Sequence, residues 1–247
     1  MALIHSFEKS GNFLFRKRGQ IPVILFLLVI PVLYYTNPSM LSEITRISLT
    51  YVAMLVSLCG FIIRAIAIGT TPKGTSGRNT NEQVAESLNR TGIYSTSRHP
   101  LYLGNYFMWI GIVIFTFNLY FVIIVSLAFW LYYERIMFAE ERFLERKFGN
   151  EYLEWSKTVP AFFPFFRKYV KGEISFSLKS VLRREYSGIL ATVFSFAFID
   201  HLREIFNTGE FEPFRLSSYV LVVTILVTLI LRTLKHSTRI FTEEGRS

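Results

Sequence analysis

Six apolar segments constrain this chain more than any other feature of its sequence. They cover residues 20–36, 44–69, 101–117, 119–139, 187–206 and 216–234. A bilayer core about 30 Å thick needs about 20 helical residues to cross it, and a helix satisfies its own backbone groups in lipid. Hydrophobic residues make up 51% of the chain, which is typical of multi-span membrane proteins. The sequence therefore predicts an all-α membrane bundle of about six transmembrane helices.

The distribution of positive charge predicts how this bundle is oriented. The net charge is +9, and Lys and Arg gather before the first segment, after the second, after the fourth and after the last. The intervening loops contain only Arg215. By the positive-inside rule, both termini and both long loops face the cytoplasm. This topology, with attraction to anionic lipid headgroups, explains the basic balance, so no nucleic-acid partner is predicted.

The chain divides into three predicted regions. They are an N-terminal two-span region with a cytoplasmic loop (1–83), a central core (84–170) and a C-terminal two-span extension (171–247). The first 20 residues lack the pattern of a cleavable signal peptide, so the first span is expected to remain as a helix bent at Pro31. The single cysteine, Cys59, excludes a disulfide framework, and no metal site is predicted.

Two shorter helices are expected in the central core. Residues 83–90 predict a short interfacial helix. Apolar residues at helical spacing between Phe143 and Val159 predict an amphipathic helix on the cytoplasmic surface. Gly149 is expected to break that helix, with Asn150 capping its second part.

Polar residues cluster at two span ends in this core. Arg98 and His99 precede Pro100 at the start of the third span, and Glu140 and Glu141 end the fourth. Each cluster alone has an ordinary explanation, as an interfacial anchor or as the start of a solvated helix. However, almost no loop joins the two spans, so they are antiparallel neighbours. Both clusters therefore lie at the same edge of the membrane and predict one polar site there.

Other charged residues near the spans are weaker candidates. Glu134 lies two helical turns before the second glutamate of the pair, on the same face, and is predicted to point into the same site. Arg64 and Arg167 are candidates for binding an acceptor substrate. Asp200 and Arg203 are three residues apart and are expected to form a structural pair near the outer surface.

Two sequence stretches together resemble the superfamily of isoprenylcysteine carboxyl methyltransferases and phospholipid methyltransferases. They are GIYSTSRHPLYLG (92–104) and EERFLERKFGNEYLEWSKTVPAFFPFF (140–166). The order Arg-His-Pro-x-Tyr-x-Gly, then Glu-Glu-x-x-Leu-x-x-x-Phe-Gly-x-x-Tyr, carries the resemblance over residues 90–166. It implies an all-helical membrane methyltransferase that uses S-adenosylmethionine. The last two spans lie outside the motifs, and the resemblance assigns them no role.

The resemblance also implies which residues form the cofactor pocket. Carried over to this chain, they are Arg98, His99, Pro100, Tyr102, Gly104, Glu140 and Glu141. Their chemistry is compatible with that role, because carboxylates accept hydrogen bonds from an ammonium group or ribose hydroxyls and a tyrosine ring attracts a sulfonium. Replacing His99 with alanine or Glu141 with glutamine is therefore predicted to weaken cofactor binding without unfolding the protein.

The acceptor is expected to be a membrane lipid or a lipidated molecule that enters sideways from the bilayer. The basic residues around the site favour an acidic acceptor, and a carboxylate or phosphate needs no general base, whereas a lipid amine must first lose a proton. O-methylation is therefore favoured over N-methylation of a phospholipid amine. No catalytic base is assigned, and the acceptor and the oligomeric state stay open.

Three alternatives belong to other classes. Membrane sterol reductases share a related helical core and bind NADPH, but their longer pattern is not evident and the glutamate pair suits a cationic donor better. A non-catalytic scaffold would not need the intact motifs. A transporter would place polar groups in the middle of its spans, whereas here they lie mostly at the ends.

Overall fold

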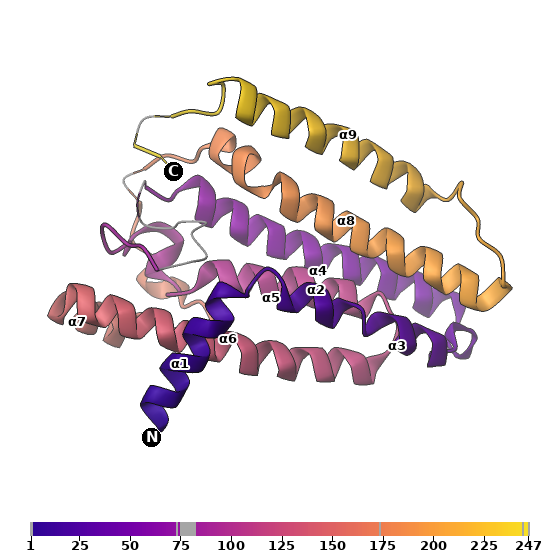
Figure 1. The fold of residues 1–247 in the computed structure, drawn as a ribbon, viewed down its shortest axis with the longest axis horizontal. Helices are drawn as coiled ribbons and strands as arrows, with labels where there is room; N and C mark the ends of the chain where they lie inside the picture. Colours follow the sequence, from indigo (N-terminus) through magenta and orange to yellow (C-terminus); the bar gives the residue numbers. More distant parts are fainter. Residues whose placement is uncertain (1, 73, 75–82, 173, 244, 247) are drawn as a thin grey trace.

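The protein is a bundle of helices (Figure 1). The computed structural model describes residues 2–72, 74, 83–172, 174–243 and 245–246, and every regular element within them is helical. The helices are α1 (Leu3–Arg16), α2 (Ile21–Phe26), α3 (Val29–Tyr35), α4 (Glu43–Gly69), α5 (Pro100–Ile114), α6 (Leu119–Phe148), α7 (Asn150–Thr158), α8 (Leu178–Thr208) and α9 (Leu216–Ser237), with short 3₁₀ turns η1 (Pro38–Met40), η2 (Gly92–Ser95) and η3 (Phe166–Lys168). The predicted all-α class is confirmed.

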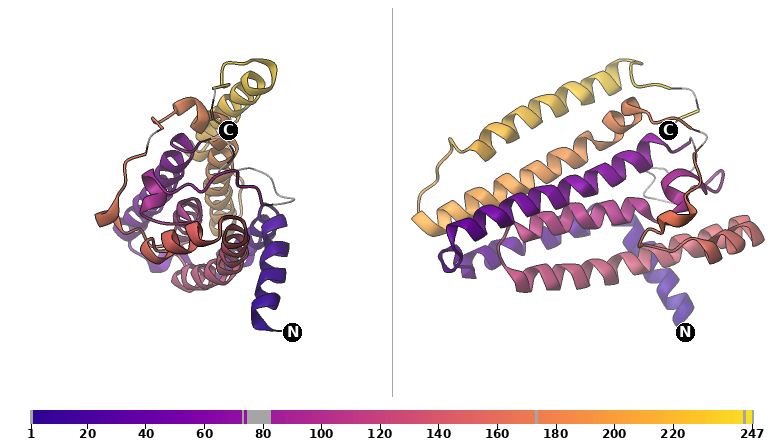
Figure 2. Two further views of the ribbon diagram at one scale, coloured as in Figure 1. Left: turned by 90° about the vertical axis from the view of Figure 1, so that its left-hand side faces the viewer. Right: turned by 180° about the vertical axis from the view of Figure 1, so that it is seen from behind.

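Three of the described helices, α4, α6 and α9, are long and apolar enough to cross a membrane. A fourth span is possible if α1 and the α2–α3 segment, bent by 78°, count as one. α5 has only 15 residues, and the longest run of α8 without Asp, Glu, Lys or Arg is residues 186–199. All six predicted segments thus lie in helices, but six crossings and cytoplasmic termini stay predictions. Both termini lie at the same end of the bundle (Figure 2).

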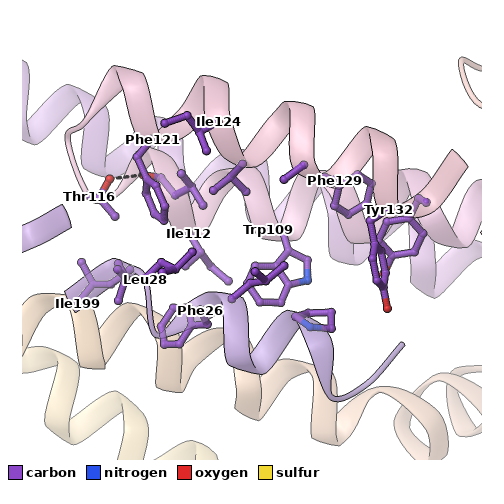
Figure 3. A pocket seen from close by; sticks show the side chains of 17 residues that line it. Phe26, Leu28, Trp109, Ile112, Thr116, Phe121, Ile124, Phe129, Tyr132 and Ile199 are labelled. Atoms are coloured by element: carbon purple, nitrogen blue, oxygen red, sulfur yellow. Dashed lines mark hydrogen bonds between the residues drawn. The ribbon is translucent and has the colours of Figure 1, made fainter. Parts of the chain in front are cut away.

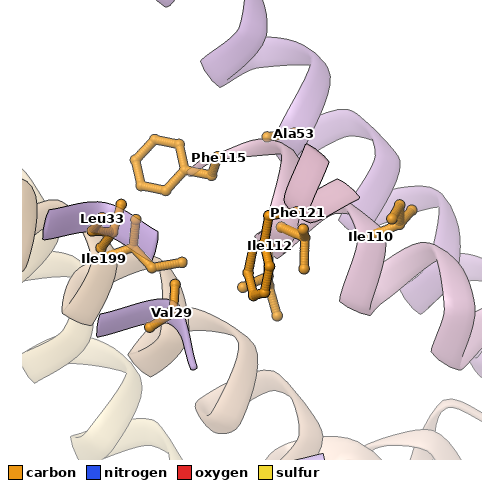
Figure 4. Packing of buried hydrophobic residues seen from close by; sticks show 9 residues of the cluster. Val29, Leu33, Ala53, Ile110, Ile112, Phe115, Phe121 and Ile199 are labelled. Atoms are coloured by element: carbon orange, nitrogen blue, oxygen red, sulfur yellow. The ribbon is translucent and has the colours of Figure 1, made fainter. Parts of the chain in front are cut away.

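α8 is part of the core of the bundle. It packs against α3, α4 and α5, while α9 packs against α8, and α6 lies against α5 and α1. Ile199 of α8 is fully buried in an apolar cluster with residues of α3 to α6 (Figure 4). The cluster consists of Val29, Leu33, Ala53, Ile110, Ile112, Val113, Phe115, Phe121 and Ile199. The C-terminal extension therefore supports the central helices.

Small residues let α4 and α5 approach closely. A Cβ added at Gly104 on α5 would lie 2.5 Å from Cγ of Arg64 and 2.8 Å from the carbonyl oxygen of Gly60. At the next turn of the same helix contact, Ser57 Oγ on α4 donates a hydrogen bond to the carbonyl of Met108 on α5 at 3.0 Å. Small side chains at such contacts are how membrane helices gain packing energy.

We expect Gly104→Ala to lower the free energy of unfolding by about 1–3 kcal/mol, because the added methyl group overpacks this contact. Denaturant unfolding of the detergent-solubilised protein measures the change. Gly19→Ala is the matched control, since nothing lies within 4 Å of a Cβ added there. Equal stabilities of the two variants would contradict this account of the helix contact.

Three local predictions need correction. Residues 83–90 form no helix. The first span breaks at Leu27–Leu28, because the carbonyl of Leu27 is the one that the missing N–H of Pro31 would have bonded. Gly149, at φ 55°, does interrupt the surface helix, but it is itself the residue before α7, and Asn150 is the first helical residue without capping it.

Candidate active site

Arg98 and His99 lie immediately before α5, beside the C-terminal part of α6. The backbone N–H of Arg98 donates to the carbonyl of Pro160 at 2.9 Å, and that of His99 donates to Ala161 at 3.1 Å. Pro100 then occupies the first position of α5, where its missing N–H has no helical partner to lose. The segment after α7 thus holds the two side chains in place.

Glu141 on α6 binds both of these side chains. Arg98 donates from Nε and Nη2 to its two carboxylate oxygens at 2.9 and 3.1 Å, and His99 Nε2 lies 3.0 Å from Oε1. Arg98 Nη1 also donates to the carbonyls of Ser156 and Val159, both at 2.7 Å. A bidentate arginine–carboxylate pair is the strongest form of ion pair. Together with the bonds to the two carbonyls, it links the start of α5 to α6 and α7.

Tyr152 on α7 lies close to this pair and is almost fully buried. Burial, and after it the negative charge of Glu141, raise the pKa of the Tyr152 hydroxyl well above its ordinary value. The phenol therefore stays neutral at any physiological pH and adds no charge to the site.

Glu140 makes a separate set of contacts. Its Oε1 accepts a hydrogen bond from the Tyr102 hydroxyl at 2.7 Å, and its Oε2 lies 3.6 Å from His99 Nδ1. The Tyr102 ring packs against Tyr133 with the ring centroids 4.8 Å apart. His99 thus stands between two carboxylates, one on each ring nitrogen, which explains why an adjacent glutamate pair is tolerated at the end of α6.

A cavity of about 360 Å³, called here the polar cavity, opens beside these residues. Its walls come from α1, α4, α5, α6, α8 and the segments before η2 and α5. Among the residues predicted from the sequence, it is lined by Arg64, Arg98, His99, Pro100, Tyr102 and Glu140. The antiparallel hairpin therefore brings the two predicted clusters together, as its short connection requires.

Four predicted residues do not line the polar cavity. Glu141 lies behind it, where it holds Arg98, and Gly104 faces α4. Glu134 is exposed on the outer face of α6, and Arg167 is exposed in η3. The prediction that Glu134 points into the site is wrong: the helical spacing was applied from the wrong glutamate, since the residue seven positions before Glu140 is Tyr133.

The predicted pair between Asp200 and Arg203 is also wrong. Asp200 accepts from Nε and Nη2 of Arg215, at 2.8 and 3.1 Å, because the α8–α9 connection brings that arginine alongside. Arg203 instead donates to the carbonyl of Phe115 at 3.0 Å. The charged groups at this end of α8 therefore have partners other than those expected.

Several residues of the polar cavity were not predicted. Asn105 and Tyr133 carry a recognisable signal, since each lies on the helix face that holds a predicted residue. Glu185 on α8 and Phe15 on α1 carry none, because their helices lie far from the motifs in sequence. Nothing in the residues around them indicates that they reach this cavity.

A second, apolar pocket of about 100 Å³ lies between the α2–α3 segment, α5 and α6 (Figure 3). Its lining includes Trp109 and Phe129, and also Leu28 and Ile124, which are exposed on the outer surface of the bundle. Tyr133 lines both this apolar pocket and the polar cavity. The two spaces therefore adjoin at one tyrosine.

Comparison with known proteins supports the resemblance seen in the motifs. Residues 47–151 match the phospholipid methyltransferase family. The chain is 30% identical over 128 residues to protein-S-isoprenylcysteine O-methyltransferase of Xenopus laevis, covering 51% of this chain and 44% of that protein. It is 31% identical over 117 residues to the protein of the same name from Saccharomyces cerevisiae, covering 47% and 49%.

A third relative has a different name. The cobalt-zinc-cadmium resistance protein CzcN of Cupriavidus metallidurans is 36% identical over 103 residues, covering 42% of this chain and 44% of that protein. No solved structure matches the chain.

These matches support the resemblance to the superfamily of isoprenylcysteine and phospholipid methyltransferases that the two motifs carry. The family match runs from α4 to the start of α7 and includes Arg98, His99, Glu140 and Glu141. α8 and α9 lie outside it. The chain spans about half the length of the curated relatives it matches.

Proposed function

We propose that this protein transfers a methyl group from S-adenosylmethionine to a membrane lipid or a lipidated acceptor. One observation carries the proposal: a polar cavity lined by His99, Tyr102 and Glu140 adjoins an apolar pocket at Tyr133. Such a pair of spaces fits a polar methyl donor on one side and an apolar acceptor on the other. The match of residues 47–151 to the phospholipid methyltransferase family supports the same reaction.

The polar cavity fits the proposed donor in size and chemistry. Its volume of about 360 Å³ lies within the range of about 300–1,000 Å³ that small-molecule sites occupy. The Glu140 carboxylate can accept hydrogen bonds from an ammonium group or from ribose hydroxyls. The arginines that line the cavity suit the donor's carboxylate, and the Tyr102 ring suits a sulfonium.

The residues of the chain act mainly by binding and alignment. S-adenosylmethionine, when bound, supplies an electrophilic methyl group. Glu141 keeps Arg98 and His99 in position, and Glu140 and Tyr102 line the polar cavity that would hold the donor. Holding two reactants in line and excluding water supplies much of the rate of such a displacement.

An acidic acceptor group fits this site better than an amine. Both ring nitrogens of His99 face carboxylates, so the imidazole is engaged and badly placed to remove a proton from an amine. An anionic oxygen needs no such base. We propose O-methylation of a carboxylate or phosphate. We also propose that the protein has six spans and cytoplasmic termini, and that its polar cavity faces the cytoplasm. N-methylation of a phospholipid amine is the second candidate, which the family match favours.

Calorimetric binding of S-adenosylmethionine to the detergent-purified protein tests the donor. We expect saturable binding, weakened up to about tenfold by His99→Ala, because one hydrogen-bonded partner of the cavity wall is lost. NADPH is the parallel titrant. Binding of NADPH in place of S-adenosylmethionine would favour a reductase, and binding of neither would favour a scaffold.

Transfer of a labelled methyl group tests the acceptor. An N-acetylated S-farnesylcysteine presents a carboxylate, and phosphatidylethanolamine vesicles present an amine. We expect the label to enter the first and to be released by mild base, as a methyl ester requires. Label that enters only the second and resists base would replace O-methylation with N-methylation.

Ala128→Trp is expected to raise the KM for the farnesylated acceptor at least about tenfold while leaving donor affinity unchanged, since filling an apolar pocket removes the burial of the acceptor chain. Ala128 lines the apolar pocket at its exposed edge, so the fold should tolerate the larger side chain. Leu131→Trp is the matched control, because Leu131 lies on the same helix and is 60% exposed. An equal effect of both variants on KM would refute the assignment of the pocket.

A further inference from the structure

The C-terminal extension contributes a buried carboxylate to the polar cavity. Glu185 lies on α8, its side chain is 2% exposed, and it lines the cavity. A carboxylate buried among membrane helices is strongly destabilising unless it is paired. Its partner is Arg64 on α4, which donates from Nε and Nη2 to the two carboxylate oxygens at 2.8 and 2.6 Å.

Arg64 passes this constraint on to α5. Its Nη1 donates to Oδ1 of Asn105 at 2.5 Å, so the other end of the Asn105 amide must carry the donor group. That group, Nδ2, donates to the hydroxyl of Tyr133 on α6 at 3.2 Å. A continuous chain of hydrogen bonds therefore links α8, α4, α5 and α6, and each orientation in it depends on the one before.

The end of this chain lies where the two proposed substrates meet. Tyr133 lines both the polar cavity and the apolar pocket. Its hydroxyl is bonded to Asn105, a residue of the polar cavity, so it faces the side where the reactive end of an acceptor would arrive. Movement of this hydroxyl would misalign that end, and alignment errors of about 1 Å lower rates about 100-fold.

We propose that Glu185 is a positioning residue for methyl transfer. Through Arg64 and Asn105 it holds the Tyr133 hydroxyl at the junction of the two spaces, so α8 is part of the active site. This inference rests on the proposed function. It gives a role to a helix that lies outside the 47–151 family match and that the motifs leave unassigned.

The test measures methyl transfer to N-acetylated S-farnesylcysteine and donor affinity in the full-length protein. We expect Glu185→Gln to lower kcat at least about tenfold with less than about threefold change in donor affinity, as loss of alignment without loss of binding requires. Glu204→Gln is the matched control: it removes an ion pair with Arg215, 2.8 Å long, at the other end of the same helix. It should leave both quantities unchanged.

A double-mutant cycle separates positioning from a merely structural role. If Glu185 acts through the Tyr133 hydroxyl, Glu185→Gln should have no further effect on kcat in a Tyr133→Phe background. Additive effects on kcat in an active wild type would overturn the proposal. The effects of the same two substitutions on the free energy of unfolding should also be non-additive. Denaturant unfolding measures this and reports on the hydrogen-bond chain without requiring an active enzyme.

Two outcomes separate failure of this inference from failure of the proposed function. A wild-type protein that binds no S-adenosylmethionine and methylates neither acceptor refutes the proposed function, and with it the role of Glu185. If Glu185→Gln leaves Arg64 unpaired and prevents folding, the double variant Arg64→Gln, Glu185→Gln removes both charges. It should fold and show the same loss of kcat, and wild-type kcat in it would overturn the proposal.

Discussion

Glutamine in place of Glu140 is expected to weaken binding of S-adenosylmethionine by a factor of about 10 to 100. Glu140 lines the polar cavity, whereas its neighbour in the pair lies behind it. Hydrogen bonds to a charged group contribute about 1.5–3 kcal/mol, which corresponds to this loss of affinity. The amide keeps the size of the side chain and an oxygen for the Tyr102 hydroxyl, so the fold should persist. Calorimetric titration measures the change.

Glu134→Gln is the control for this variant. Glu134 lies on the same helix but is exposed on its outer face, so its replacement should leave donor affinity within about twofold. If both substitutions have the same small effect, Glu140 does not bind the donor and the polar cavity needs another occupant. Glu141→Gln, by contrast, should act mainly on the position of Arg98.

Alanine in place of Arg98 is expected to lower the free energy of unfolding by about 3 kcal/mol and to abolish donor binding. Its side chain is 14% exposed and that of its partner Glu141 is 26% exposed. Removing one member of such a pair leaves the other charge uncompensated, which costs about 3–5 kcal/mol when both are buried. The carbonyls of Ser156 and Val159 also lose their donor. Denaturant unfolding and calorimetry together measure the two effects.

Arg142→Ala serves as the control for Arg98→Ala. Arg142 pairs with Glu145 one turn along the same helix, at 2.6 Å, with both side chains about one-third exposed. Such solvated pairs contribute about 0.3–0.5 kcal/mol. A loss of stability in the Arg98 variant no greater than in the Arg142 variant would show that the arginine does not join α5, α6 and α7.

Much of the fold follows from the apolar segments alone. Five of the six predicted spans each lie in one helix and the first lies in two, α2 and α3, because hydrophobic runs of this length form helices in lipid. The N-terminal helix α1 was not predicted, since its pattern is short and its partner α6 is distant in sequence. The number of crossings is not settled by helix length, because α5 is too short and α8 too charged at its ends.

The candidate site could be predicted wherever two elements are joined by a short connection. The short connection between spans three and four requires them to pack as antiparallel neighbours, which places His99 beside Glu140 and Glu141. The same reasoning fails for Glu134. The choice between neighbouring faces of one helix needs the angle at which the helix packs, and the sequence does not contain that angle.

The sequence by itself determined the helical class, the resemblance to the methyltransferase superfamily and the two polar clusters, because apolar length, charge and motif spacing are local properties. Tertiary structure decided which carboxylate faces the cavity, that Tyr133 joins the two spaces, and that Glu185 completes the wall. These contacts join helices separated by tens to more than a hundred residues. They arise from the packing of small residues between α4 and α5 and of α8 against both, and no local pattern encodes that arrangement.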